Sequence, residues 1–177
     1  MRYHQLGLLH HDPQRSFAGY TLVAPLRHSA VFLVDMEGAE VHRWELPGPL
    51  GSKAYLLPGG HLLFSTFTQE GTPIKEAKGG HIYEMDWDGN IVWEHVDHDQ
   101  HHDIRRLDNG NTVYIAWEEM SNDEQARVQG GLPGTERDGK TYSDIFREVN
   151  PAGEVVWEWH LKDQVIEDFP LAPDCER

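Results

Sequence analysis

The segment from His95 to Asp103 holds the residues best suited to chemistry in this chain of 177 residues. It reads His-Val-Asp-His-Asp-Gln-His-His-Asp, so four imidazoles and three carboxylates lie within nine residues. A neutral imidazole is a competent nucleophile or base, and a neighbouring carboxylate can fix its tautomer. The segment therefore predicts a histidine-based centre, with His102 and His101 as the candidate catalytic residues.

Transfer of an anionic group by such a centre also needs cationic side chains around the oxygens that move. The candidates for substrate binding, chosen by their nearness in sequence or in the repeat described below, are Lys53, Arg105, Arg106 and the aromatic Trp117. Side chains alternate along a strand, so Arg105 and Arg106 are expected on opposite faces of it. At most one of the two arginines can then share a face with a given group.

Two other interpretations of the same segment stay open. It can be a polar surface loop that is rich in histidine, or it can supply ligands to Zn²⁺ or a similar ion. The alternative metal ligands are Asp97, His98, Asp99 and Asp103. No spacing matches a named metal motif such as H-E-x-x-H, and no phosphate-binding P-loop motif is present, so no cofactor is expected.

An internal repeat indicates the elements that must position these residues. Three segments align without gaps, namely Gly38–Trp44, Gly89–His95 and Gly153–Trp159. Each follows a short turn-forming run that itself follows an apolar stretch, which is the pattern of a β-hairpin with a glycine turn. A second unit aligns Ala54–Phe64 with Ile104–Tyr114, 50 residues further on.

Two hairpins in about 50 residues make a four-stranded sheet that repeats, which is typical of a β-propeller blade. We therefore expect an all-β fold of three antiparallel blades at about 19–46, 52–95 and 102–160, the first incomplete, with tails at 1–18 and 161–177. With strands a to d counted from the axis outward, the short glycine turns share one face. The longer b–c and d–a connections, including the histidine-rich segment at the mouth of the central channel, share the other.

Aromatic residues at repeat positions are expected to fill the interfaces between blades, since large flat side chains bury much area. His42 aligns with Trp93 and Trp157, so we expect it to be packed rather than catalytic. The segment 120–140 is rich in Gly, Asn, Asp and Glu and is expected to form a long loop.

Composition excludes several classes of protein. Lys plus Arg is 15 against 30 for Asp plus Glu, a formal charge of −15 with no basic patch, which argues against nucleic acid as a partner. The single Cys175 excludes internal disulfides. No apolar run reaches the roughly 20 residues of a membrane span, and no secretory signal is recognisable. We expect a cytoplasmic protein that does not bind membranes.

Three blades are too few to close a ring, because propellers typically have 4 to 8. An open stack exposes sheet edges that invite pairing with another chain. Three explanations stay open: two copies form a six-bladed ring, a complementary propeller half completes a split protein, or the chain is a partial product. The expected partner is a second copy or such a half, with a small-molecule substrate possible.

Four strings, in order, carry a resemblance to a known family: Gly19–Pro25, Asp35–Trp44, Tyr55–Gly60 and His101–Asn111. Together they resemble the arylsulfotransferase family. The resemblance implies a six-bladed propeller and a histidine near the axis that accepts a sulfuryl group from an aryl sulfate and passes it to a phenol. His102 best matches an active-site histidine of that family, and His101 lies beside it.

Three functions follow as hypotheses. The chain is an arylsulfotransferase-like enzyme, or a non-catalytic propeller half that acts as a binding or assembly module. The third hypothesis is a metal-dependent hydrolase or lyase that uses the segment 95–103.

Overall fold

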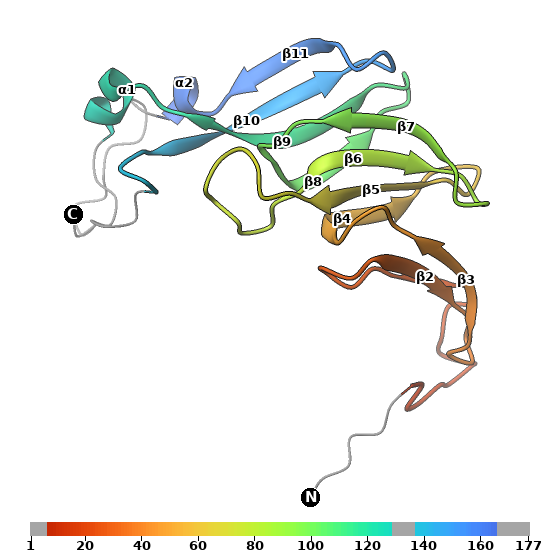
Figure 1. Ribbon diagram of the computed structural model, residues 1–177. Coiled ribbons are helices and arrows are strands. Elements are labelled where there is room, and N and C mark those ends of the chain that lie inside the picture. The colour runs from red at the N-terminus through yellow and green to blue at the C-terminus, as the bar shows by residue number, and fades with distance from the viewer. Residues whose placement is uncertain (1–6, 129–136, 166–177) are drawn as a thin grey trace, which may run out of the picture.

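The fold is all-β, as the repeat predicts. The computed structural model describes residues 7–128 and 137–165, which form eleven strands in three antiparallel sheets and two short helices. The sheets lie side by side in a stack and do not close on themselves (Figure 1). The arrangement is that of an incomplete propeller, so we refer to the three sheets as blades one, two and three.

The strand bounds give one incomplete blade and two full ones, as expected. Blade one contains β1 (Thr21–Val23), β2 (Ala30–Val34) and β3 (Glu40–Glu45). Blade two contains β4 (Leu50–Leu56), β5 (Leu62–Phe67), β6 (Gly80–Met85) and β7 (Ile91–Val96). Blade three contains β8 (Gln100–Arg106), β9 (Thr112–Glu119), β10 (Tyr142–Val149) and β11 (Val155–His160). Within each blade, consecutive strands pair with each other.

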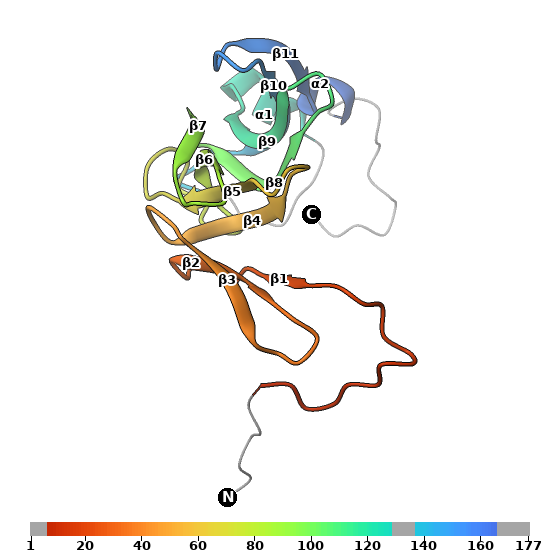
Figure 2. The ribbon, with the colours of Figure 1, turned by 90° about the vertical axis from the view of Figure 1, so that its right-hand side faces the viewer.

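The turns and the long connections separate onto two faces. The turns between the last two strands of each blade contain Gly38, Gly89 and Gly153, with φ angles of +81°, +89° and +81° that residues with a side chain rarely adopt. These short turns lie at the right of Figure 1, and the connections β5–β6 and β9–β10 lie at the left. The inner strands β4 and β8 of neighbouring blades lie beside each other (Figure 2).

The β9–β10 connection differs from the expected plain loop. It contains a helix of one and a half turns, α1 (Asn122–Arg127), whose N-cap Ser121 forms a capping box with Glu124. The Ser-x-x-Glu spacing is the signature of such a helix start, but the segment is too short to show an apolar helical period. A second short helix, α2 (Lys162–Val165), follows β11. No helix in the described part of the chain is long and apolar enough to cross a membrane.

The buried core lies between the blades and is anchored by tryptophans. Trp44 of blade one is 1% exposed, and its indole N–H donates to the carbonyl of Asp86 in the last turn of blade two at 3.0 Å. Trp93 of blade two donates in the same way to the carbonyl of Pro151 in the last turn of blade three at 3.0 Å. The expectation that tryptophans fill the blade interfaces is confirmed at both places.

The packing of His42 is also confirmed. Its ring stacks on Trp87 at a centroid distance of 3.8 Å and meets Trp44 edge-on at 4.2 Å. This histidine is therefore part of the interface between blades one and two.

Candidate functional site

A β-bulge near the start of β8 sets the geometry of the histidine pair. His101 pairs with Ile115, but the next pair in the ladder is Ile104 with Tyr114, so His102 and Asp103 are left without ladder partners. A bulge bends the strand and re-aims the side chains at that point. His102 and Asp103 are both exposed there, on the innermost strand of blade three.

The backbone of His102 is held in an unfavourable conformation by contacts with blade two. Its φ is +51°, in the left-handed region that residues with a side chain seldom occupy. The His102 N–H donates to the carbonyl of Ala77 at 2.8 Å, and its carbonyl accepts from the Ser52 hydroxyl at 2.6 Å. Strained residues of this kind persist only where their surroundings fix them, and they cluster at functional sites.

A carboxylate and two imidazoles lie in a row at the bulge. His101 is 3% exposed, and its Nδ1 lies 2.7 Å from His102 Nδ1. On the other side, His101 Nε2 lies 3.3 Å from Asp144 Oδ1, within ion-pair distance although not aligned as a hydrogen bond. The imidazole holds the pKa of Asp144 below its ordinary value, so this carboxyl group is ionised near neutral pH.

The row favours one arrangement of protons. A carboxylate only accepts, so a neutral His101 places its proton on Nε2, toward Asp144. His101 Nδ1 is then an acceptor, and His102 donates its Nδ1–H to it. This assignment, which follows from the partners of each nitrogen, leaves a lone pair on Nε2 of the exposed His102. The row can therefore supply a general base or a nucleophile.

The four predicted substrate-binding residues take different places. Lys53, in the β4 bulge, lies beside the site, with its Nζ 3.1 Å from Asp103 Oδ1. Arg106 faces blade two, where it pairs with Glu84 at 2.7 Å. Arg105 is exposed on the opposite side of the strand, as alternation predicts. The structure therefore brings Lys53 close to the histidine pair and commits Arg106 to the blade interface.

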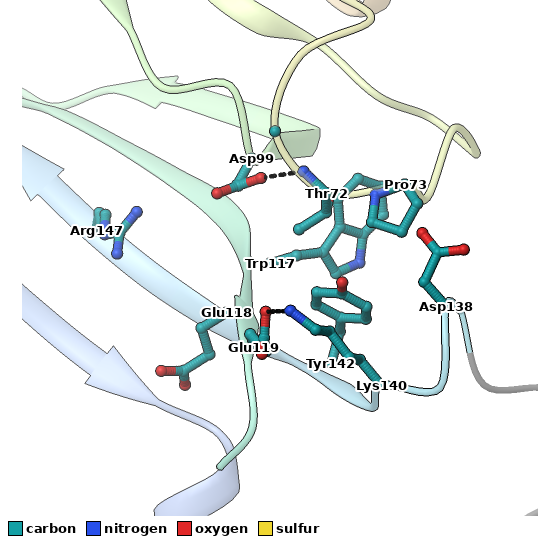
Figure 3. A pocket seen from close by; sticks show the side chains of 11 residues that line it. Thr72, Pro73, Asp99, Trp117, Glu118, Glu119, Asp138, Lys140, Tyr142 and Arg147 are labelled. Carbon is teal, nitrogen blue, oxygen red and sulfur yellow. Dashed lines mark hydrogen bonds and ion pairs between the residues drawn. The ribbon is translucent and has the colours of Figure 1, made fainter.

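Trp117 connects the histidine pair to a cavity. Its ring stacks on His101 at a centroid distance of 3.9 Å, and it is 8% exposed. It also lines a cavity of about 590 Å³ between the β5–β6 connection and blade three (Figure 3). The charged groups of the lining are Asp99, Glu118, Glu119, Asp138, Lys140 and Arg147. Acidic groups outnumber basic ones, so the cavity does not favour an anion such as sulfate.

The residues of the alternative metal site do not converge. Each has another partner in the fold: Asp97 accepts from Tyr114 and Arg147, His98 pairs with Glu70, Asp99 accepts from the Thr72 N–H, and Asp103 pairs with Lys53. In residues 7–128 and 137–165, no group of three or more His, Cys, Asp or Glu side chains is placed to hold a metal ion. The geometry gives this alternative no support.

A buried polar network lies behind the site. Tyr114 donates to Asp97 at 2.9 Å and lies 3.1 Å from His95 Nε2, and Arg147 pairs with the same carboxylate at 2.8 Å. Burial and the nearby Asp97 raise the pKa of Tyr114 well above its usual value, so it stays a donor. Burial lowers the pKa of His95, which favours its neutral form. His95 thus has a structural role between blades two and three.

The comparisons with known proteins leave the family open. No protein-family model matches this chain. No curated protein matches it either. One solved structure that resembles it is a protein of unknown function from Bacteroides caccae, with 16% identity and a TM-score of 0.49. The alignment covers 88% of this chain and 49% of that one, so this chain spans about half its length. The resemblance to the arylsulfotransferases therefore stays a prediction.

Sequence reasoning missed one residue of the row. Asp144 lies 43 residues after His101, and no local motif joins them. A signal existed in the repeat, because pairing of the strands places Asp144 directly opposite Trp117. If the strand pairing of blade two is carried over to blade three, Asp144 falls beside the end of β9.

Proposed function

We propose that this chain carries a histidine-based group-transfer centre that moves a sulfuryl group from an aryl sulfate to a phenol. The row Asp144–His101–His102, which ends in an exposed imidazole nitrogen, is the observation that carries the proposal. It has the logic of a catalytic triad, in which a carboxylate orients an imidazole that acts on the next group. The resemblance in sequence supports the substrate class.

The reaction proceeds in two displacements. The lone pair of His102 Nε2 forms a bond to sulfur, the sulfur–oxygen bond to the aryl group breaks, and the electron pair leaves on the phenolate. An acceptor phenol then attacks the sulfur, the nitrogen–sulfur bond breaks, and its electron pair returns to Nε2. The proton that the acceptor loses balances the one that the first phenolate takes up.

The neighbouring groups stabilise the intermediate state. Sulfonation of Nε2 leaves positive charge on the His102 ring, and its Nδ1–H then donates more strongly to His101, which Asp144 supports in turn. Lys53 is the nearest predicted cation for the sulfuryl oxygens, although Asp103 competes for it at 3.1 Å. The cavity beside Trp117 offers room for a neutral phenol.

Turnover of a chromogenic aryl sulfate with a phenol acceptor tests the proposal. His102→Ala should lower turnover by roughly 10³-fold or more, because the nucleophile is lost. His61→Asn is the matched control, since His61 contacts Glu84 as Asn111 contacts Glu148, away from the bulge. Mass spectrometry of a peptide containing His102 should find one added SO₃ group after reaction without acceptor. Turnover that is absent, or unchanged in His102→Ala, contradicts the proposal.

A further inference from the structure

The same sheet face occurs on blades two and three, and its contacts in blade two supply a template. The strand pairings make Trp93 of blade two equivalent to Trp157 of blade three, because each lies opposite a glutamate, Glu84 or Glu148. Those glutamates are themselves equivalent, since each accepts a hydrogen bond from the inner hairpin of its own blade, at 2.7 Å from His61 and at 2.6 Å from Asn111. The faces of blades two and three that look toward the next blade therefore share one layout.

The next blade covers this face in blade two. Trp93 donates to the carbonyl of Pro151, and Arg106 reaches back to Glu84 while its guanidinium lies 4.6 Å from the centre of the Trp93 ring. Leu63 and Ile82 on the same face are fully buried against blade three. A polar anchor and an apolar centre thus make up the interface.

The equivalent face of blade three is bare among the residues that the structure describes. Trp157 is 48% exposed, although it occupies the position of Trp93. A cavity of about 180 Å³ opens nearby, and its lining includes Arg105, Val113, Ile115 and Phe146. These four are the equivalents of Tyr55, Leu63, Ser65 and Ile82 in blade two. Blade three lies at one end of the stack, and no sheet formed by residues 7–128 or 137–165 lies beyond it (Figure 1).

We infer that this bare face of blade three binds blade one of a second copy of the chain. Blade one presents the right chemistry on its outer side. Val23 and Val34 are half-buried at the positions that Tyr114 and Val149 use to pack against blade two. Met36, in the last turn of blade one, takes the place of Pro151, whose carbonyl accepts from Trp93.

In a dimer, the bare face of blade three and the outer side of blade one are both covered in each copy. The contact joins different surfaces on the two partners, and a two-fold axis can pair blade three of each copy with blade one of the other. In the resulting contact, Trp157 donates to the carbonyl of Met36 from the partner copy. Each copy carries a formal charge of −15, so added salt should strengthen the association by screening repulsion.

Measurement of mass in solution tests the inference. The chain has a mass of 20.3 kDa, so a dimer of about 41 kDa, twice that value, is expected over a concentration series in light scattering. Trp157→Glu should shift the mass to that of the monomer with an unchanged circular dichroism spectrum. Val92→Glu adds the same charge at a residue that is 51% exposed on the outer strand of blade two, and it should leave the dimer intact. A monomeric parent chain, or a Trp157→Glu variant that stays dimeric, overturns the inference.

Cross-linking identifies the surfaces and does not depend on the stability of Trp157→Glu. Chains with Met36→Cys are mixed with chains with Trp157→Cys, both on a Cys175→Ser background, and oxidised. Cross-linked dimers should form in the mixture and not in either variant alone. Cross-links between two Trp157→Cys chains, or none in the mixture, would contradict the pairing of blade three with blade one.

Discussion

Blades two and three each contain a bulge at the same place on the inner strand, but only one of the two bulges carries the catalytic candidates. In blade two the ladder passes from Leu50 to Ala54, and in blade three it passes from His101 to Ile104. The residues without ladder partners are Gly51, Ser52 and Lys53 in the first case and His102 and Asp103 in the second, and the paired His101 is the repeat equivalent of Gly51. The bulge is therefore a feature of the repeated fold. The candidate catalytic side chains occur at the bulge of blade three and not at that of blade two.

The neighbours of each bulge explain which side chains fit. A Cβ on Gly51 would lie only 2.9 Å from Gly79 Cα and from Ser65 Oγ, so blade two has no room for a side chain there. At the equivalent position in blade three, the His101 ring packs flat on Trp117. Asp144 corresponds to Gly80 of blade two, because Asp144 pairs with Trp117, Gly80 pairs with Phe67, and Trp117 lies 50 residues after Phe67, which is the repeat distance. Blade three thus carries an imidazole and a carboxylate at two positions where blade two has glycine.

Of the changes that test the difference between the two bulges, removal of the Asp144 carboxylate should have the largest effect. Asp144→Asn is expected to lower the kcat of the proposed reaction by about 10²- to 10⁴-fold with little change in KM, because His101 loses the group that fixes its proton. Asp88→Asn, at an exposed turn of blade two, is the control. Steady-state kinetics measure both parameters. An unchanged kcat would show that the row of three residues has no catalytic role.

Addition of a side chain at Gly51, in the bulge of blade two, should lower the stability of the fold. Gly51→Ala is expected to lower the free energy of unfolding by about 1–3 kcal/mol, because the new Cβ collides with backbone that cannot easily move. Gly48→Ala is the control, since its nearest contact, Thr66 Cβ, is 3.6 Å away and is ordinary packing. Urea denaturation measures the difference. Equal stability of the two variants would mean that space does not explain the glycine.

The hydrogen bond that joins the two bulges should contribute less. Ser52→Ala removes the donor to the His102 carbonyl, and we expect a loss of about 1 kcal/mol. Thermal unfolding of Ser52→Ala measures this loss, and Ser29→Ala, at an exposed serine, is the control. If Ser52→Ala also lowers turnover several-fold, the contact with blade two positions the histidine. A loss no larger than that of Ser29→Ala would show that the bond is unimportant.

The smallest expected effect is on the pH dependence of stability. The folded pKa of Asp144 lies below its ordinary value of 3.8 because of His101, so its stabilisation is complete above that pH and is lost as the pH falls through the folded pKa. Wild-type protein should therefore lose stability more steeply than Asp144→Asn as the pH falls below about 4. Unfolding at a series of pH values checks the slope, and parallel curves would contradict the assigned interaction.

The fold was largely predictable from the sequence because its signals are local. Gly38, Gly89 and Gly153 mark turns whose positive φ requires glycine, and the apolar stretches beside them set the strands. The alignment of His42 with two tryptophans correctly indicated packing in an interface. These features depend on neighbours within a few residues or on the repeat itself.

The site was less predictable because it depends on contacts between distant residues. The sequence indicated His101 and His102 as candidates, but the burial of one and the exposure of the other come from the bulge. Arg106 could not be assigned to Glu84, because that pair spans two blades. The helix α1 was missed because a capping box is the only signal in so short a segment.

The left-handed backbone of His102 has a consequence for the fold as a whole. Glycine adopts that conformation freely, whereas a residue with a Cβ is disfavoured there by roughly 1–2 kcal/mol. A protein selected for stability alone would therefore place glycine at position 102, and the sequence carries an imidazole instead. The difference in the free energy of unfolding between His102→Gly and His102→Ala would show how much stability a side chain costs at this position.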